Sequence, residues 1–459
     1  MKSARFWLGL WAGKAAAFVY KLKGHAENDR PGTLARRFDI DFIKHASKPG
    51  TMTVVTGTNG KTSMTNMIAG MYEGHGEKVA SNRTGHNNLA GQSWLFLKSN
   101  DILNRTKVDV MVMEADEMFA SETFPQIDPD YILVTNIGRD SMFRNATPDF
   151  IQERVEKGID GCTKATLILN GDDPMSCFFG PDKKHIYYGV DDIHAPKTEY
   201  MIEEFSVCPV CGKRPKYHYH NMRQIGSFYC PHCGLKAPEK DYLVMSFDSR
   251  EMSVREPDGQ VRQYPIVDKG LHNIYNAVSL VAYFRTIGWS YEEVYRGIGQ
   301  IELPKTRFMY EKVGDIELCM YTAKSQNFMA ASLMYENDSF DTSDKEIIII
   351  TDEEFAPGQT EIVEMSTWIY DVQYEFLNRP NVKRIIVGGN MYLDHKLRLL
   401  MAGIPEEKIT AVRYYMEAAE AVDVEGIKKI MIYRDMENIK LTEDVFARVV
   451  ERLKERWEQ

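Results

Sequence analysis

Short apolar runs alternate with longer amphipathic stretches through the first two thirds of the chain. The runs at 52–55, 108–113, 131–135 and 165–169 are rich in Val, Ile, Leu and Met. Apolar runs of this length are typical of buried strands. Strands that alternate with helices favour a parallel sheet with helices on both faces. A helix predicted over 273–286 returns the chain to the same sheet, so the pattern indicates a doubly wound α/β domain.

The same alternation of strands and helices recurs in the last third of the chain. Strands are predicted at 346–350, 384–387 and 430–433, and a charged helix is predicted from Thr442. This pattern is typical of a second, Rossmann-like α/β domain. Pro304 marks the boundary between the two domains. The expected division of the chain is therefore 1–48, 49–303 and 304–459.

Composition and charge exclude several classes of protein. The chain has 459 residues, of which 44% are hydrophobic and 27% are charged, as in ordinary globular proteins rather than disordered ones. The formal net charge of −10 argues against an electrostatic grip on nucleic acid by the whole molecule, so no nucleic-acid partner is expected. No apolar run approaches the ~20 residues that a membrane-spanning helix needs. We therefore expect a cytoplasmic protein.

The first 25 residues carry five Lys or Arg residues and no Asp or Glu. Lys14 interrupts their apolar stretch, which a secretory signal would keep unbroken. Aromatic residues are interspersed with these charges at Phe6, Trp7, Trp11, Phe18 and Tyr20. A basic aromatic helix of this kind either lies on the anionic inner face of the cytoplasmic membrane or packs on the next domain. Both interpretations stay open at the level of sequence.

Four of the seven cysteines form two Cys-Pro-x-Cys-Gly knuckles: Cys208, Cys211, Cys230 and Cys233. Their spacing is the zinc-ribbon signature, and four thiolates close a tetrahedral structural Zn²⁺ site. The ribbon is expected to interrupt the first α/β domain as an insertion at about 205–240. Its basic flanks leave nucleic-acid binding open, but a closed four-cysteine site more often stabilises an insertion too small to bury its own core. The remaining cysteines are expected to be buried apolar side chains: Cys162, Cys177 and Cys319.

A glycine-containing loop with the sequence TGTNGKT occupies 56–62, between the predicted strand at 52–55 and a helix that begins at Lys61. In such a loop, backbone N–H groups and the helix N-terminus bind phosphate groups. Lys61 would neutralise charge on the γ-phosphate of ATP, and Thr62 would offer its hydroxyl to Mg²⁺. The strict G-x-x-x-x-G-K-[ST] pattern fails at Val55. The residues expected to bind ATP here are Gly57, Thr58, Asn59, Gly60, Lys61 and Thr62.

The TGTNGKT loop resembles that of the Mur ligases, the ATP-dependent ligases that build the peptidoglycan stem peptide. The segment Glu114-Ala-Asp116-Glu117, at the end of a predicted strand, is similar to the acidic Mg²⁺-binding motif of this family. The resemblance implies that Glu114 binds Mg²⁺, with Asp116 or Glu117 nearby. Residues 272–277 resemble the HNxxN helix start of the family, which implies that Asn273 contacts adenine.

Within the Mur ligases, the chain is similar to the MurT family of ligase subunits. The similar segments are 82–85, 135–144 and 169–174, and an inserted four-cysteine ribbon is a trait of this family. The resemblance implies an amidation in which ATP phosphorylates the α-carboxylate of D-glutamate in lipid II, a lipid-linked peptidoglycan precursor. Ammonia then displaces the phosphate and leaves D-isoglutamine. Phosphorylation supplies the leaving group that a carboxylate lacks.

The sequence contains no Gly-x-Cys-x-Gly elbow of the kind that marks a glutaminase nucleophile. The resemblance therefore implies that a GatD-like glutaminase forms a heterodimer with this chain and supplies ammonia. Residues 368–371 resemble the WIWD segment of the family, so Asp371 would orient the catalytic His of that partner. Alternatively, Asp371 is a surface residue on an amphipathic helix. Lys324, retained from the AKNP segment of the family, is a further candidate catalytic residue.

The last domain departs from the MurT pattern at 325–326, 358–365 and 433–436. The ATP-binding half keeps its motifs, so the reaction type is better defined than the acceptor or the partner. Two other functions stay open: a Mur-type ligase that joins another amine or amino acid to a different acid, and a non-catalytic nucleotide-binding scaffold with a zinc ribbon. Retention of Lys61 and Glu114 argues against the scaffold.

Overall fold

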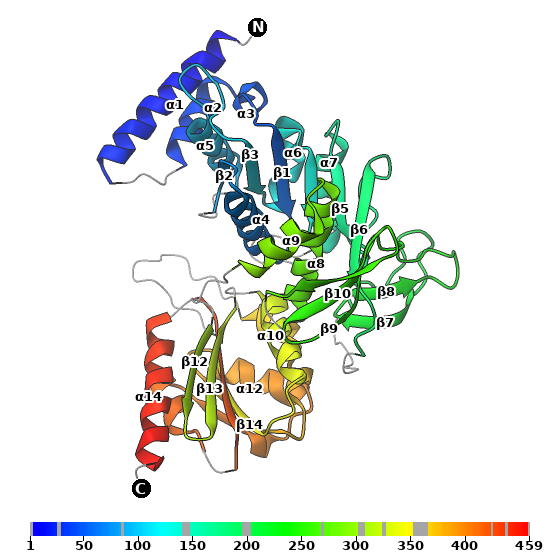
Figure 1. The fold of residues 1–459 in the computed structure, drawn as a ribbon. Coiled ribbons are helices and arrows are strands. Elements are labelled where there is room, and N and C mark those ends of the chain that lie inside the picture. Colours follow the sequence, from blue (N-terminus) through cyan, green and yellow to red (C-terminus); the bar gives the residue numbers. More distant parts are fainter. Residues whose placement is uncertain are drawn as a thin grey trace. The chain divides into compact units, whose positions relative to one another are not determined.

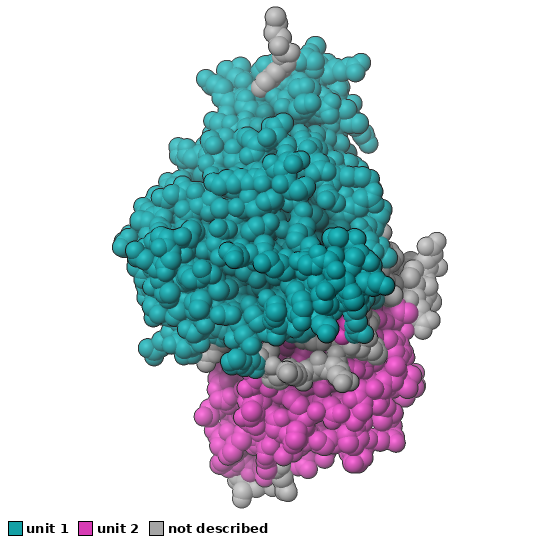
Figure 2. All heavy atoms as spheres, turned by 90° about the vertical axis from the view of Figure 1, so that its right-hand side faces the viewer, with its two compact units in different colours: residues 1–139, 147–194, 204–302 teal, residues 140–146, 195–203, 303–459 magenta. Residues whose placement is uncertain are grey.

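The computed structural model describes residues 3–24, 29–83, 87–139, 147–194, 203–267, 270–301, 308–323, 327–351, 366–423, 426–436 and 439–457. The chain divides into two compact units (Figure 2). Unit 1 comprises residues 1–139, 147–194 and 204–302, and unit 2 comprises residues 140–146, 195–203 and 303–459. Each unit has its own sheet and its own hydrophobic core.

Unit 1 is built on a nine-stranded sheet with the strand order β11-β10-β9-β6-β5-β4-β1-β3-β2 (Figure 1). Its parallel part consists of β1 (Thr51–Thr56), β2 (Val79–Ser81), β3 (Val110–Glu114), β4 (Tyr131–Val134), β5 (Thr166–Asn170), β6 (Lys184–Val190) and β9 (Tyr242–Phe247). This part confirms the predicted parallel sheet. An antiparallel edge follows, made of β10 (Glu251–Arg255) and β11 (Val261–Pro265). The edge was not predicted, because its strands have few consecutive apolar residues.

Helices cover both faces of this sheet. One face carries α1 (Ala4–Leu22), α2 (Arg30–Phe38), α3 (Phe42–His45), α5 (Leu89–Ser99), α6 (Ala120–Ile127) and α7 (Pro148–Asp160), and the other carries α4 (Lys61–His75), α8 (Leu271–Thr286) and α9 (Tyr291–Gly299). Successive residues of a strand point to opposite faces. Met52 and Val54 of β1 therefore join the core under the first set of helices, while the Thr53 hydroxyl lies 2.6 Å from the Tyr283 hydroxyl of α8. The strands are buried on both faces, which accounts for the continuous apolar runs in the sequence.

The N-terminal helix α1 packs against the rest of unit 1 along one side. Phe6, Gly9, Leu10 and Gly13 are buried in this contact. A Cβ atom at Gly9 would lie 2.7 Å from the carbonyl oxygen of Ala35 in α2, so glycine permits the close approach of the two helices. The interpretation of α1 as a helix that packs on the following domain is confirmed for this side of the helix.

The insertion that carries the four cysteines contains an antiparallel hairpin of β7 (Lys216–Met222) and β8 (Ile225–Tyr229). Phe205, before the hairpin, and Phe228, within it, join the main core of unit 1. Their ring centroids lie 5.2 Å apart. The insertion therefore shares the core of the large sheet instead of forming a separate one.

Unit 2 contains a six-stranded sheet with the order β12-β13-β17-β14-β15-β16. Its strands are β12 (Phe308–Val313), β13 (Ile316–Thr322), β14 (Lys345–Ile350), β15 (Val382–Gly388), β16 (Ile409–Val412) and β17 (Lys429–Arg434). All neighbours pair in parallel except β12 with β13. One face is covered by α10 (Phe328–Ser339), α11 (Thr367–Asp371) and α12 (Tyr392–Met401), and the other by α13 (Tyr415–Glu420) and α14 (Ile439–Trp457). The predicted strands of the last third are thus present in one α/β layer structure.

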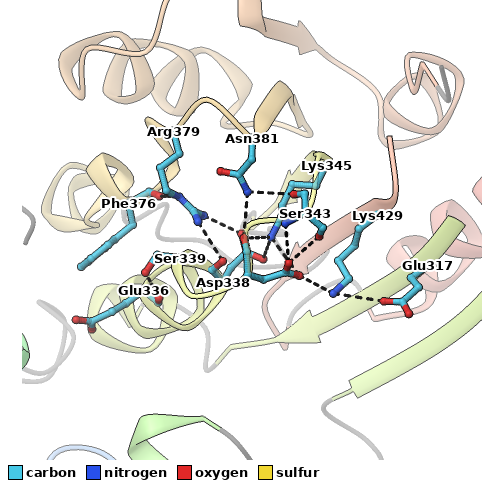
Figure 3. Close-up of polar contacts among 11 residues, drawn as sticks. Glu317, Glu336, Asp338, Ser339, Ser343, Lys345, Phe376, Arg379, Asn381 and Lys429 are labelled. Carbon is cyan, nitrogen blue, oxygen red and sulfur yellow. Dashed lines mark hydrogen bonds and ion pairs between the residues drawn. The ribbon is translucent and has the colours of Figure 1, made fainter. Parts of the chain in front are cut away.

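A buried polar network holds the start of β14 in unit 2 (Figure 3). The Lys345 side chain is buried, and its Nζ donates to Asp338 Oδ1 at 2.7 Å. Arg379 Nη2 donates to the other carboxylate oxygen of Asp338 at 3.0 Å. Lys429 Nζ, at the start of β17, pairs with Asp341 at 2.7 Å. Each of these charges has an opposite partner, so none is left uncompensated in the interior. The network lies at the amino ends of the strands, whereas ligands of such folds bind at the carboxyl ends.

Candidate nucleotide site and four-cysteine cluster

The loop at 57–60 connects β1 to α4 at the carboxyl end of β1. Gly57 has a φ of 125°, and Gly60 has a φ of 87°, a region that side chains other than glycine's rarely adopt. A Cβ atom at Gly57 would also lie 2.4 Å from the Thr135 hydroxyl oxygen. Glycine is therefore required at position 57 by both conformation and space.

The residues that follow β4 fix the shape of this loop. The Thr58 N–H donates to the Asn136 carbonyl at 2.8 Å, and the Thr58 hydroxyl both donates to the Gly138 carbonyl and accepts from the Gly138 N–H, each at 3.0 Å. The Thr135 hydroxyl donates to the Asn59 carbonyl at 2.6 Å. The loop and residues 135–138 therefore form one hydrogen-bonded unit.

Lys61, the first residue of α4, lies folded over its own loop. Its Nζ donates to the Gly57 carbonyl at 2.5 Å and to Glu117 Oε2 at 2.8 Å. Glu117 belongs to the short 3₁₀ helix Glu117–Phe119 and is 2% exposed. Burial raises the pKa of Glu117, and the charge of Lys61 opposes that rise. The structure thus gives the loop lysine a buried acidic partner.

The acidic segment at the end of β3 lies beside the loop, because β3 is the neighbour of β1 in the sheet. Glu114 pairs with Val55 in the parallel ladder. The Asn82 side chain donates to the Glu114 carbonyl and accepts from the Glu114 N–H, while Asn87 Nδ2 donates to Glu114 Oε1 at 3.0 Å. Asp116 accepts from the Met118 N–H and so starts the 3₁₀ helix. These contacts hold the Glu114 carboxylate in one orientation.

The roles of Asn82 and Asn87 were not foreseen from the sequence. Residues 82–85 were singled out only for a family resemblance, and the structure places Asn82 as the backbone partner of Glu114. Thr84 and Gly85 lie outside the described residues. Thr62, in the first turn of α4, is exposed. The structure thus brings together three of the predicted features of the site: the loop at 57–60, Lys61 and the acidic segment at 114–117.

The start of α8 also reaches the loop. Asn273 is buried in the first turn of this helix. A Cβ atom at Gly60 would lie 3.3 Å from Asn276 Oδ1, one turn further along α8. Segments far apart in the sequence, at 57–61, 114–117, 135–138 and 273–276, thus meet around one loop.

The four cysteine thiols of the insertion converge. All four Sγ atoms lie within 4.8 Å of one another, with Cys208 Sγ 3.6 Å from Cys233 Sγ and Cys211 Sγ 3.5 Å from Cys230 Sγ. Four thiolates at ~2.3 Å from one tetrahedral Zn²⁺ would be ~3.8 Å apart, so the donor set fits this metal. The other three cysteines are buried, as predicted: Cys162, Cys177 and Cys319.

The knuckles that present these thiols have the expected local turns. The Gly212 N–H donates to the Cys208 carbonyl at 2.9 Å, and the Gly234 N–H donates to the Cys230 carbonyl at 3.0 Å. Both glycines have positive φ, 68° and 80°, which the tight turn requires. Each knuckle therefore aims two thiols toward a common centre.

The candidate residues of unit 2 are only partly described. Asp371 is the last residue of α11 and is half-buried. Its neighbour Tyr370 donates from its hydroxyl to Asp394 of α12 at 2.9 Å, which joins the two helices. Lys324 lies outside the described residues, as do Asp140 and Arg144 of the 135–144 segment.

Comparison with known proteins assigns relatives to both halves of the chain. The model of the Mur ligase middle domain matches residues 55–222, and that of the MurT ligase C-terminal domain matches residues 325–435. The subunit MurT of lipid II isoglutaminyl synthase (glutamine-hydrolyzing) from Streptococcus pneumoniae is 29% identical over 432 residues, 93% of each chain. Its counterpart from Staphylococcus aureus is 27% identical over 425 residues, 92% of this chain and 94% of the relative.

Solved structures share the fold at lower identity. A pseudomurein peptide ligase type C from Methanothermus fervidus matches with a TM-score of 0.67 and 17% identity, covering 92% of this chain and 85% of that one. MurF from Acinetobacter baumannii matches with a TM-score of 0.64 and 14% identity, covering 91% of this chain and 80% of that one. The α/β architecture of the chain is thus the one these ligases have.

Proposed function

The chain is a MurT-like member of the Mur ligase family of ATP-dependent ligases, and we propose that it amidates a carboxylate of a lipid-linked peptidoglycan precursor. In the proposed reaction, ATP phosphorylates the α-carboxylate of D-glutamate in lipid II. Ammonia attacks the acyl phosphate, and inorganic phosphate leaves, which yields D-isoglutamine. The observation that carries the proposal is the convergence of the loop at 57–60, Lys61 and Glu114 in unit 1.

Each of these residues has a role that its chemistry supports. The first backbone N–H groups of α4, where the loop at 57–60 ends, would bind the phosphates of ATP. Lys61 would neutralise charge on the transferred phosphoryl group, and Asn273 would contact adenine. Thr62 and Glu114 would hold Mg²⁺, which when bound offsets the negative charge of the phosphates. Zn²⁺ on the four cysteines would be structural, because four protein ligands leave no open position.

The names of the relatives describe a subunit, and we propose that a GatD-like glutaminase docks on α12 in unit 2. Leu393, Leu397 and Met401 are 59%, 49% and 56% exposed along one side of this helix, while its buried side consists of the polar His395 and Arg398 together with Leu399. Helices that cover a sheet in a monomer usually have polar residues on their outer side. An exposed apolar side of this kind marks a protein interface.

The position of Asp371 supports this docking site. The hydrogen bond between Tyr370 and Asp394 joins the end of α11 to α12, so a partner on the exposed side of α12 would also meet Asp371. Leu397→Lys should abolish co-elution with the glutaminase, while Leu441→Lys on α14, where the leucine is 41% exposed, should not. Equal co-elution of both variants would contradict this surface.

We further propose that α1 rests on an anionic membrane surface. Phe18 and Leu22 are 64% and 72% exposed, one turn apart on the side away from the packed one, and Lys21 and Lys23 are exposed near the end of the helix. Basic and aromatic side chains together favour anionic lipid. None of the described helices has the length and apolar character to cross a bilayer. Phe18→Ser/Leu22→Ser should lose co-sedimentation with phosphatidylglycerol vesicles but keep its melting temperature; retained binding would contradict the proposal.

Mass spectrometry of lipid II incubated with the protein, ATP, Mg²⁺ and ammonium tests the central reaction without a partner. Conversion of one carboxylic acid to an amide, lost in Lys61→Ala, would support amidation. No conversion, with ATP binding intact, would argue against free lipid II as the acceptor. Addition of glutamine and the glutaminase then tests the source of ammonia separately.

A further inference from the structure

The turn of the β7–β8 hairpin lies inside unit 1, although it belongs to an insertion. Asn221 is fully buried, and Met222, Arg223 and Gln224 are 5%, 4% and 4% exposed. Hairpin turns normally lie on the surface, where water satisfies their polar groups. Here the protein itself must satisfy them, so the contacts of the turn show what it supports.

One side of the turn reaches the segment that shapes the phosphate loop. Gln224 Nε2 donates to the Ile137 carbonyl at 3.1 Å, and the Gln224 side chain also hydrogen-bonds to Asp173. Asp173 Oδ2 accepts from the Ile137 N–H at 2.8 Å. Ile137 is therefore held at both of its backbone polar groups.

Ile137 lies between the two residues that bind the loop. Its predecessor Asn136 accepts from the Thr58 N–H, and its successor Gly138 exchanges two hydrogen bonds with the Thr58 hydroxyl. Gln224 thus acts on Thr58 through one intervening segment. Displacement of Ile137 would displace Thr58 and with it the loop that leads into the N-terminus of α4, where phosphate is expected to bind.

The other side of the turn reaches α8. Asn221 Nδ2 donates to the Val190 carbonyl at 2.8 Å and to the Tyr275 hydroxyl at 3.1 Å. The Tyr275 hydroxyl in turn donates to Asp172 Oδ2 at 3.0 Å. Tyr275 lies between Asn273 and Asn276 in the first turns of α8, so the hairpin contacts both elements that border the loop.

The backbone of the turn is strained at Arg223, and an ion pair with Glu204 holds the Arg223 side chain. Arg223 has a φ of 46°, a left-handed conformation that costs a non-glycine residue about 1 kcal/mol or more. Its Nη2 lies 3.5 Å from Glu204 Oε1, and Arg139 Nε lies 3.6 Å from the same oxygen. Strained residues persist where surrounding contacts over-determine them, which agrees with a turn that must keep one position.

We propose that the four-cysteine insertion is a positioning element for the phosphate loop, with Gln224 as its contact residue. The metal-bound knuckles hold the base of the hairpin, and its turn holds Ile137 and thereby Thr58. Nucleotide affinity is consequently coupled to metal occupancy. The inference rests on the proposed function only in that the loop at 57–60 binds ATP.

Calorimetric titration of the full chain with an ATP analogue that resists hydrolysis tests this coupling. Gln224→Ala should weaken binding on the order of tenfold, since it removes hydrogen bonds to a buried carbonyl and a buried carboxylate. Zinc content should stay at the wild-type level, and the melting temperature without nucleotide should fall only by the few degrees that lost buried hydrogen bonds cost. Lys216→Ala, an exposed position on β7, is the matched control and should bind as wild type does. A lowered melting temperature with unchanged affinity would reduce Gln224 to a structural role and overturn the proposal.

Removal of zinc by a chelator gives a second, independent perturbation. The metal-free wild type should lose affinity to the same order as Gln224→Ala, and chelation of Gln224→Ala should add little, because both changes act through one contact. The coupling would be overturned if chelation and Gln224→Ala each lowered nucleotide affinity by independent factors that multiply. It would also be overturned if chelation of the wild type left the affinity unchanged. If wild-type protein binds no nucleotide, the proposed function fails as well; if it binds and ignores both perturbations, only this inference fails.

Discussion

At the scale of single residues, the pair of Lys61 and Glu117 is the clearest energetic unit of the nucleotide site. Nζ and Oε2 are 2.8 Å apart and both side chains are buried. Removing one partner of a buried pair leaves the other charge uncompensated, at a cost of about 3–5 kcal/mol. We expect Lys61→Met to lower the free energy of unfolding by about this amount, and Lys61→Met/Glu117→Gln to recover most of it. Denaturant unfolding measures both; an equal loss in the two variants would contradict the pairing.

The same pair predicts a pH dependence. Burial raises the pKa of Glu117 above its ordinary 4.5. For a raised pKa, the contribution to stability is fully present below the unfolded value and is lost as pH rises through the folded one. Lys61→Met removes the opposing charge and so raises the pKa of Glu117 further; its deficit in stability against wild type should therefore grow as pH rises above the ordinary value of 4.5. The double variant has no carboxylate at 117, so its stability should lack the decrease with rising pH that Glu117 causes, and it serves as the control.

Glu346 gives a corresponding prediction for unit 2. Burial raises its pKa to about 7, although the Asp423 N–H and Arg384 oppose the shift. Its contribution to stability is therefore present below pH 4.5 and is lost as pH rises through about 7. Glu346→Gln keeps an acceptor for the Asp423 N–H and should become more stable than wild type above pH 7. Glu407→Gln, at an exposed position, should change nothing; a pH-independent effect of Glu346→Gln would count against the raised pKa.

At the scale of elements, the strand–loop–helix unit of β1 and α4 depends on two different requirements for glycine. Gly57→Ala meets both positive φ and the Thr135 hydroxyl, whereas Gly76→Ala, with a φ of 108° and nothing within 4 Å, meets only the backbone strain. We expect Gly76→Ala to cost about 1 kcal/mol and to leave ATP binding unchanged. Gly57→Ala should cost more and abolish binding. Similar affinities in the two variants would show that the contact with 135–138 does not shape the loop.

The elements that sequence predicted well are those specified locally. The strands of both sheets and the start of α4 follow from apolar runs, glycines and a short polar loop within a few residues of one another. The partner of Lys61 depends instead on the register of β1 with β3 and on the 3₁₀ turn that brings Glu117 back over the loop. From the sequence, the segment 114–117 was expected only to bind Mg²⁺, through Glu114, and no partner of Lys61 was predicted.

The burial of the turn between β7 and β8 could not be predicted from the sequence. Arg223 and Gln224 are polar residues between two strands, a pattern that indicates an exposed turn. Their burial is decided by tertiary contacts with Ile137, Asp173 and Glu204, none of which is close in sequence. The role of the insertion therefore becomes visible only in the structure, even though its four cysteines are the most specific motif in the chain.

At the scale of the whole molecule, the two units have separate sheets and separate cores. Chains built in this way need not unfold in one transition. We expect calorimetry to resolve two transitions, of which ATP with Mg²⁺ raises only that of unit 1. A ligand at a hundred times its Kd stabilises the folded form by about 2.7 kcal/mol, which a melting curve resolves.

Glu346→Gln identifies the transition of unit 2, because Glu346 belongs to that unit and the substitution is expected to raise its stability above pH 7. Nucleotide and this substitution should therefore act on different transitions of the same protein. If both instead shift one common transition, the units unfold together, and a perturbation on α12 or α11 would then reach the nucleotide site through stability alone. Two independent transitions would leave the proposed docking surface on α12 and the proposed ATP site linked only by the chemistry that passes between them.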